Sequence, residues 1–297
     1  MKVGFIGLGI MGKPMAKNLI KANYELTIYA RNINTVDEFR KLGVNIADNC
    51  KEVAEQSEAI ILMLPNSPDV EDVLSGQKGL MEGLSAGKVV IDMSSINPAE
   101  SQRFAELVSV KGTEWLDAPV SGGEPKAIDG TISVMVGGKE AVFNKYYDLI
   151  KSMAADVVRV GDLGAGNTAK LCNQIIVALN IAAVSEAFVL AKKAGVDPAV
   201  VYKAIRGGLA GSAVMDAKGP MMMEGNFKPG FRLDLHIKDL QNALDISHLA
   251  EVSLPLTASI MEIMQSLRTY HLQKYDHSAI IKYYEKMNNI TIGNNLD

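Results

Sequence analysis

The N-terminal stretch of the chain, KVGFIGLGIMGKPMAKNLIKAN, joins a strand pattern, a glycine-rich turn and a helix pattern without interruption. The apolar run at 2–7 is typical of a strand, and the apolar spacing over 11–23 is typical of a helix. The turn between them, GLGIMG, has the G-x-G-x-x-G spacing that lets a backbone approach a pyrophosphate at a helix N-terminus. It predicts a dinucleotide site that contains Gly7, Leu8, Gly9, Ile10, Met11 and Gly12.

Strand-like and helix-like segments continue to alternate through the first half of the chain. Alternation at this spacing predicts βαβ units, and therefore a mostly parallel sheet with helices on both faces. The later strands are expected at 25–30, 44–46, 59–64, 88–94, 113–119, 132–138 and 157–164, and the later helices at 34–42, 50–56, 68–75, 97–112 and 139–153.

The pattern changes after Asn167, where strand signals almost disappear and helices separated by GG, KP and LP breaks follow one another. An α/β Rossmann-type domain at 1–163 and an all-α domain at 164–297 account for this change. The stretch GAGNTAKLCNQIIVALNIAAVSEAFVLAKKAG at the boundary predicts one helix of about 28 residues, roughly 40 Å long, that joins the two domains.

The composition is that of a soluble globular protein, with 48% hydrophobic and 22% charged residues among 297. A net charge of -4 without any basic block argues against nucleic acid or an anionic membrane as a partner. Cys50 and Cys172 lie far apart and the four histidines lack ligand spacing, so a reducing compartment and no metal site are expected. The N-terminus lacks a signal-peptide cleavage site and polar residues interrupt the long apolar helix, so we expect a cytoplasmic protein without a membrane span.

The end of the second predicted strand indicates which dinucleotide is bound. An NAD site usually carries an acid there, which hydrogen-bonds the ribose 2′-hydroxyl. Here the strand ends YARN, and the guanidinium of Arg31 is suited to a 2′-phosphate unless it is simply a solvated surface residue. NADP is therefore favoured over NAD, with Arg31 and Asn32 as contacts. The ends of two later strands, MLPN and MSS, add Leu64, Pro65 and Ser95, because ligands of an open α/β sheet bind where its strands end.

Three further features leave alternatives open. The stretch DAPVSGGEPKAIDGT (117–131) is expected to be a loop, in which SGG either presents backbone amides to a carboxylate or makes an ordinary turn. The stretch PMMMEGNFKPGF (220–231) is either a flexible lid or core filler, and the adaptability of methionine favours the core. Lys170 lies near the start of the long apolar helix. Burial of an ammonium group is costly, so the side chain either reaches solvent at the helix end or is buried because it has a functional role.

Four motifs in a fixed order then identify a resemblance that covers essentially the whole chain. GLGIMG, DAPVSGG, GAGNTAKLCNQ and DLHIKDL resemble the β-hydroxyacid dehydrogenase family, the relatives of 3-hydroxyisobutyrate dehydrogenase and 6-phosphogluconate dehydrogenase. The segments GGEPKAIDGT, IRGGLAGS and DLHIKDL, together with DHSA and the YYEK that follows it, look most like the members of this family that reduce 2-hydroxy-3-oxopropanoate to glycerate, and the resemblance implies that reaction. Turnover of 3-hydroxyisobutyrate, succinic semialdehyde or a similar small acid is the alternative, and the presence of Lys170 argues against a cofactor-binding scaffold without catalysis.

The resemblance also implies roles for individual residues. Lys170 matches the catalytic lysine in the pattern G-x-x-x-K-x-x-N, and a lysine whose pKa is lowered by desolvation can act as general acid and, in reverse, as base. The partners implied are a small hydroxy or oxo acid and further copies of the chain in a homodimer or homotetramer. Two departures from the family pattern are the missing acid at Ala30-Arg31 and the serine at position 95, where threonine is common. The substrate contacts implied are Ser121, Gly122, Gly123, Asn173 and Lys238, the last of which also reaches the nicotinamide.

Overall fold

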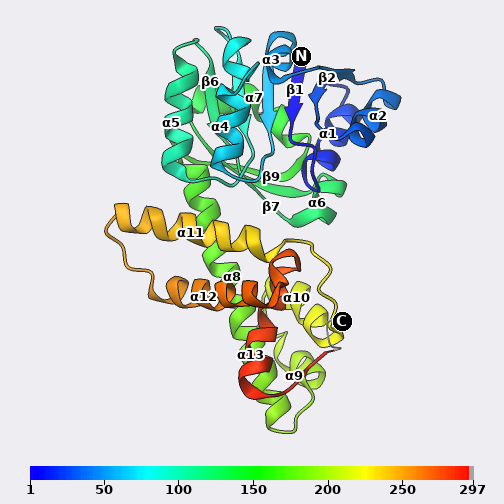
Figure 1. Cartoon of the computed structure of the whole chain (residues 1–297), viewed down its shortest axis with the longest axis vertical. Coiled ribbons are helices and arrows are strands. Elements are labelled where there is room, and N and C mark those ends of the chain that lie inside the picture. Colours follow the sequence, from blue (N-terminus) through cyan, green and yellow to red (C-terminus); the bar gives the residue numbers. More distant parts are fainter. Residues whose placement is uncertain (294–297) are drawn as a thin grey trace. The chain divides into compact units, whose positions relative to one another are not determined.

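The computed structural model describes residues 1–293 and divides into two compact units, Met1–Lys170 and Leu171–Asp297 (Figure 1). Residues 294–297, the end of the predicted second domain, lie outside the described residues. The boundary between the units falls inside one continuous helix, α8 (Ala165–Lys193).

The first unit is built on a nine-stranded sheet with the order β3-β2-β1-β4-β5-β6-β8-β7, in which β9 pairs with β8. The strands from β3 to β6 are all parallel, and β8 runs antiparallel to β6 and β7 and parallel to β9. The mostly parallel Rossmann-type sheet is therefore confirmed, with the strand order 3-2-1-4-5-6 of dinucleotide-binding domains. The strands are β1 (Lys2–Ile6), β2 (Glu25–Tyr29), β3 (Asn45–Ile46), β4 (Ala59–Leu62), β5 (Val89–Asp92), β6 (Glu114–Asp117), β7 (Val120–Ser121), β8 (Ile132–Gly137) and β9 (Ala154–Gly161).

Helices cover both faces of this sheet because its central strands are apolar on both sides. In β4, Ala59 and Ile61 belong to one buried cluster, whereas Ile60 and Leu62 belong to another. The first cluster includes side chains from α1, α2, α6 and α7, and the second includes side chains from α3, α4 and α5. The helices are α1 (Gly12–Lys21), α2 (Ile33–Lys41), α3 (Cys50–Gln56), α4 (Ser67–Ser75), α5 (Pro98–Ser109), α6 (Gly123–Asp129) and α7 (Glu140–Lys151), with a 3-10 turn η1 (Leu80–Glu82).

One segment of the first unit differs from the prediction. The stretch 117–131 is not a plain loop, because it contains the short strand β7 and the helix α6. The helix forms because Ala127 is fully buried in the core and its carbonyl accepts a hydrogen bond of 2.8 Å from the side-chain amide of Asn18 in α1. Ser121 pairs with Ser133 of β8, which fixes the start of the segment to the sheet.

The described residues of the second unit form helices and the segments that connect them, with no strand apart from a single bridge between Arg232 and Asp276, so the predicted all-α character is confirmed there. α11 and α12 run side by side (Figure 1). Side chains of α8 belong to the same apolar core. Met222 of the methionine-rich segment is fully buried in this core, which confirms the core interpretation for that side chain. The remaining elements are α9 (Pro198–Ile205), α10 (Ala213–Glu224), α11 (Leu233–Leu249), α12 (Pro255–Ser266), α13 (Ile281–Asn288) and the 3-10 turns η2 (Leu267–Tyr270), η3 (Leu272–Lys274) and η4 (His277–Ile280).

The long helix α8 has 29 residues, close to the predicted length. Among the described helices it alone has the length and composition of a membrane span, but half of its most apolar 18-residue window is buried inside the protein. Ala178, Ile181 and Phe188 on its buried face belong to the core of the second unit. These contacts are what a core helix makes, in agreement with the prediction.

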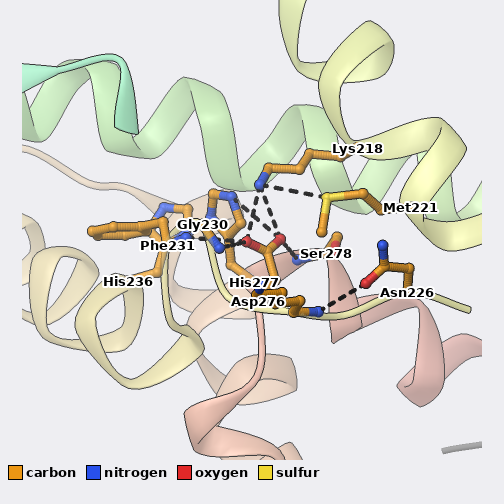
Figure 2. A network of polar contacts seen from close by, with 10 residues as sticks. Lys218, Met221, Asn226, Gly230, Phe231, His236, Asp276, His277 and Ser278 are labelled. Carbon is orange, nitrogen blue, oxygen red and sulfur yellow. Dashed lines mark hydrogen bonds and ion pairs between the residues drawn. The ribbon is translucent and has the colours of Figure 1, made fainter. Parts of the chain in front are cut away.

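A fully buried carboxylate, Asp276, holds together the loop before α11 and the segment that leads into α13 (Figure 2). Its oxygens accept hydrogen bonds from the backbone N–H groups of Gly230, Phe231 and Ser278, each at 3.0 Å. The ammonium of Lys218 in α10 lies 2.9 and 3.0 Å from the two oxygens. Burial favours the protonated acid, but the charges of His277 and Lys218 and these amides outweigh it, so the pKa of Asp276 lies below its usual range.

Two buried histidines extend this network toward α8. His236 Nε2 lies 3.0 Å from the backbone carbonyl oxygen of Gln174, which can only accept, so Nε2 carries the proton. In the neutral ring its Nδ1 is then an acceptor, and it receives the N–H of His277 Nδ1 at 2.8 Å. Figure 2 shows the two rings beside Phe231, whose ring centroid lies 5.7 and 5.4 Å from theirs. The histidine pair thereby links α8 to α11 and η4.

Replacing Lys218 with methionine tests how much the ion pair with Asp276 contributes. We expect the free energy of unfolding at neutral pH to fall by about 3 kcal/mol, because the buried carboxylate loses its partner. Since the folded pKa of Asp276 is lowered, its stabilising contribution is present above about pH 4 and is lost as the pH falls further, so the difference between variant and parent narrows in acid. Urea unfolding at several pH values measures both effects.

The matched control is Lys139→Met, which removes a surface ion pair with Glu114 whose side chains are 66% and 41% exposed. Such a pair contributes at most about 1 kcal/mol. An equal loss of unfolding free energy in Lys218→Met and Lys139→Met would contradict a central role for Asp276.

Candidate active site

The glycine-rich turn after β1 has the geometry that a bound pyrophosphate requires. Gly7 has φ of +101°, and a Cβ there would lie 2.2 Å from the carbonyl oxygen of Met63, so only glycine fits. A Cβ on Gly12, the first residue of α1, would lie 2.0 Å from the carbonyl oxygen of Gly7. At Gly9, by contrast, no atom lies within 4 Å of the Cβ position, which leaves open space beside the backbone at the N-terminus of α1. The turn therefore fits a phosphate group of a dinucleotide.

The other candidate cofactor residues follow neighbouring strands. Arg31, Leu64 and Ser95 come after β2, β4 and β5. In the parallel part of the sheet β2 and β4 flank β1, and β5 lies beside β4. The three residues therefore lie at one edge of the sheet, with Pro65 beside Leu64. The strand ends are tied together, because the Leu64 N–H donates to Ser94 Oγ at 2.8 Å. Ser94, which the sequence analysis passed over, is thus a structural residue next to the candidate Ser95.

Arg31 and Asn32 have different surroundings. The Asn32 side chain accepts hydrogen bonds from the N–H groups of Asn34 and Thr35 and caps α2. Arg31 is exposed, and its positive charge acts to lower the pKa of the Cys50 thiol at the start of α3. Burial raises the pKa of that thiol to about 11, with a smaller contribution from Asp72, and the Arg31 charge acts in the opposite direction.

A cavity of about 620 Å³ lies beside the glycine-rich turn. Leu8, Gly9, Ile10 and Asn32 line it, so it contains four of the residues predicted to bind the cofactor. Its other wall comes from α6, the helix that begins at Gly123, directly after Ser121 and Gly122. The predicted substrate loop and the predicted phosphate turn are therefore neighbours within the first unit, an arrangement that depends on α6 and was not predicted. The α6 residues that line the cavity are Glu124 and Ile128.

Three lysines of α1 that belong to none of the predicted site residues also line this cavity, namely Lys13, Lys17 and Lys21. Lys13 and Lys17 lie 2.8 and 2.6 Å from the two carboxylate oxygens of Glu38 in α2. Their hydrogen bonds and charges lower the pKa of Glu38 to about 2. The three ammonium groups outnumber the two carboxylates beside them, Glu38 and Glu124, which leaves a net positive charge beside the phosphate turn. This favours an anionic ligand.

Lys170 does not reach solvent, because it is only 6% exposed. It lies near the start of α8, and that start is held by Asp117 at the end of β6. The two Asp117 carboxylate oxygens accept hydrogen bonds of 2.8 Å from the N–H groups of Gly164 and Asn167. Burial raises the pKa of Asp117 to about 6, although these amides act in the opposite direction, so the carboxylate form predominates at neutral pH. Asp117 is a residue of the DAPVSGG motif for which the sequence indicated no role.

The second unit brings Asn173 and Lys238 into one hydrogen-bonded chain. Asn173 Nδ2 donates to Gln174 Oε1 at 2.8 Å, and Gln174 Nε2 donates to a carboxylate oxygen of Asp239. The other oxygen of Asp239 lies 2.9 Å from the ammonium of Lys238. Gln174 and Asp239 are buried and were not predicted, although both fall inside quoted motifs. They fix the two candidate substrate contacts relative to each other.

Replacing Gly9 with alanine tests the phosphate turn. We expect the dissociation constant for NADPH to rise at least about tenfold, because a methyl group would fill the space left for a phosphate. The free energy of unfolding should change by less than about 1 kcal/mol, since the new methyl meets no protein atom. Gly207→Ala is the control, because its Cβ position is equally open. Unchanged NADPH affinity in Gly9→Ala, measured by fluorescence titration, would contradict this placement of the cofactor.

Comparisons with known proteins bear on both units. A family model of the NAD binding domain of 6-phosphogluconate dehydrogenase matches residues 2–161. A second model, of the NAD-binding domain of NADP-dependent 3-hydroxyisobutyrate dehydrogenase, matches residues 164–284. The two matches together cover the strands of the first unit and reach into α13, the last helix of the second.

Individual relatives match over nearly the full chain. The 2-hydroxy-3-oxopropionate reductase of Escherichia coli is 45% identical over 290 residues, which are 97% of this chain and 99% of that protein. The 2-(hydroxymethyl)glutarate dehydrogenase of Eubacterium barkeri is 38% identical over 98% of this chain and 97% of its own. A 3-hydroxyisobutyrate dehydrogenase structure from Salmonella typhimurium superposes with a TM-score of 0.86 at 29% identity, over 95% of this chain and 99% of that one. The chain therefore belongs to the β-hydroxyacid dehydrogenase family and is an NAD(P)-dependent oxidoreductase that acts on a hydroxyl group.

Proposed function

We propose that the enzyme reduces 2-hydroxy-3-oxopropanoate to glycerate, reversibly, with NADPH preferred over NADH. The observation that carries this proposal is the 45% identity, over almost all of both chains, with the Escherichia coli 2-hydroxy-3-oxopropionate reductase. The buried Lys170 and the polar network around Asn173 and Lys238 agree with a small, charged and hydroxylated substrate.

Lys170 is the proposed general acid. Reduction of an aldehyde needs a hydride at carbon and a proton at oxygen, and the bound nicotinamide supplies the hydride. The Lys170 ammonium donates the proton to the carbonyl oxygen, and the neutral amine takes it back in the reverse reaction. A desolvated ammonium gives up its proton more readily than a solvated one, and before transfer its charge stabilises the developing alkoxide.

The other proposed roles follow the order of the residues in the chain. We assign the pyrophosphate to the turn from Gly7 to Gly12 and the 2′-phosphate to Arg31 and Asn32. Support for NADP comes from the exposed Arg31 guanidinium and the lack of an acid at the end of β2. We assign the adenosine and nicotinamide riboses to Leu64, Pro65 and Ser95, the substrate carboxylate to Ser121, Gly122 and Gly123, and the substrate hydroxyl and nicotinamide end to Asn173 and Lys238.

Assembly and compartment are part of the same proposal. We propose that the first 163 residues bind the cofactor and that the helical remainder binds substrate and forms a homodimer or homotetramer. Ile176 and Leu190 of α8 are 60% and 70% exposed in the single chain, which supports an interface between copies. The free thiols of Cys50 and Cys172 agree with a cytoplasmic location.

The proposed substrate and cofactor are tested by following NADPH and NADH absorbance with a panel of aldehydes. We expect kcat/KM to be highest for 2-hydroxy-3-oxopropanoate and lower for methylmalonate semialdehyde and succinic semialdehyde. We also expect faster oxidation of NADPH than of NADH. No turnover of 2-hydroxy-3-oxopropanoate would remove the substrate assignment, and faster oxidation of NADH would remove the role of Arg31.

Replacing Lys170 with alanine tests the proton donor. We expect kcat to fall by about 10²–10⁴-fold, the usual contribution of a general acid, while NADPH binding stays within about threefold of the parent. Lys193→Ala, an exposed lysine at the other end of the same helix, is the control and should keep full activity. Turnover retained in Lys170→Ala would exclude this mechanism.

A further inference from the structure

The start of α8 lacks a side-chain cap from its own chain segment. Gly164 occupies the N-cap position, because its carbonyl accepts the first helical hydrogen bond from the Thr168 N–H at 2.9 Å. A glycine has no side chain with which to satisfy the exposed amides of the first turn. Asp117, 47 and 50 residues earlier in the chain, accepts from the Gly164 and Asn167 N–H groups instead. A strand end therefore supplies the cap of this helix.

The first turn of α8 also lies in direct contact with the sheet. A Cβ on Gly166 would lie 2.5 Å from the carbonyl oxygens of both Asp117 in β6 and Met135 in β8. The backbone of the turn therefore approaches two strands as closely as a glycine permits. Together with the Asp117 carboxylate, this contact leaves the turn little freedom to slide or rotate.

A second side chain connects the same turn to a different strand end. Asn167 is fully buried, and its Oδ1 accepts a hydrogen bond of 3.0 Å from the Ile96 N–H. Ile96 directly follows Ser95, a candidate contact for the cofactor or substrate after β5. Asn167 therefore links the helix turn to the Ser95 loop across 71 residues of sequence.

We infer that Asp117 and Asn167 are positioning residues that fix Lys170 relative to the Ser95 loop. Lys170 follows Asn167 by three residues, so both lie on the same side of α8, less than one turn apart. A shift of the first turn would carry the Lys170 ammonium with it by a similar distance. Misplacement of a reacting group by about 1 Å can cost about 100-fold in rate. The hydrogen bonds of Asp117 and Asn167, which anchor this turn, therefore affect catalysis although neither residue touches substrate.

This inference rests on the proposed role of Lys170, and two variants test it separately. Asp117→Asn keeps the size of the side chain but replaces one acceptor oxygen with an NH₂ group, so one of the two cap bonds is lost. Asn167→Ala keeps its backbone N–H bonded to Asp117 and removes only the link to Ile96. The control is Gln102→Ala, which removes an exposed hydrogen bond of 2.9 Å to the Leu163 carbonyl in the same turn.

We expect kcat to fall at least about tenfold in Asp117→Asn and in Asn167→Ala, whereas KM and NADPH affinity stay within about threefold. Backbone hydrogen–deuterium exchange over residues 163–170 should become faster in Asp117→Asn. In the double variant, Asp117→Asn with Asn167→Ala, kcat should fall by less than the product of the two single fold-changes, because both changes act on one turn. Gln102→Ala should keep kcat within about twofold.

Urea midpoints measured on the same samples separate this role from simple destabilisation, which lowers the midpoint without changing kcat of the folded enzyme. If Asp117→Asn does not fold, Asn167→Ala alone decides the question. The inference is overturned if kcat stays within twofold of the parent in a folded variant, or if kcat and KM change together. The exchange measurement needs no substrate, so faster exchange combined with full activity of Lys170→Ala would show that the anchor exists and that the proposed chemistry is wrong.

Discussion

The buried carboxylate of Asp117 fixes the first turn of α8, the longest of the described helices. Removing a carboxylate from water is costly, and burial accordingly raises its pKa to about 6. The cost is offset because two backbone N–H groups at the start of α8 point at its oxygens, where the helix dipole also favours a negative charge. The position of Lys170 follows from this contact, since Lys170 lies only five residues after the start of the helix.

The parallel sheet explains why residues far apart in sequence are gathered at one edge. Each of β1, β2, β4, β5 and β6 runs in the same direction, so the segments that follow them lie together. Helices cover both faces of the sheet with two separate apolar clusters, and only its edges remain available for polar chemistry. The turn at Gly7, the loop at Ser95 and the Asp117 carboxylate that caps α8 all lie where these parallel strands end.

The features that depend on local periodicity were predictable from the sequence. The helix predicted at 50–56 is α3, and the predicted long helix is α8. The segment 117–131 was not predictable as strand and helix, because α6 depends on Asn18 of a distant helix and on burial of Ala127. The cap by Asp117 was missed for a related reason. Its partners are backbone amides about fifty residues away, and backbone groups leave no signature in a sequence.

A buried aspartate accompanies each of the two lysines to which the proposed chemistry gives a role. Asp117 holds the helix turn before Lys170, and Asp239 lies 2.9 Å from Lys238 while accepting from Gln174. Buried charges of this kind contribute little net stability, because their desolvation offsets their attraction, and apolar side chains of similar size would often serve the fold equally well. What an apolar residue cannot supply is a fixed direction for a hydrogen-bonding neighbour. The two carboxylates are therefore better explained by the geometry that they impose on the lysine-bearing helices than by the stability of either unit.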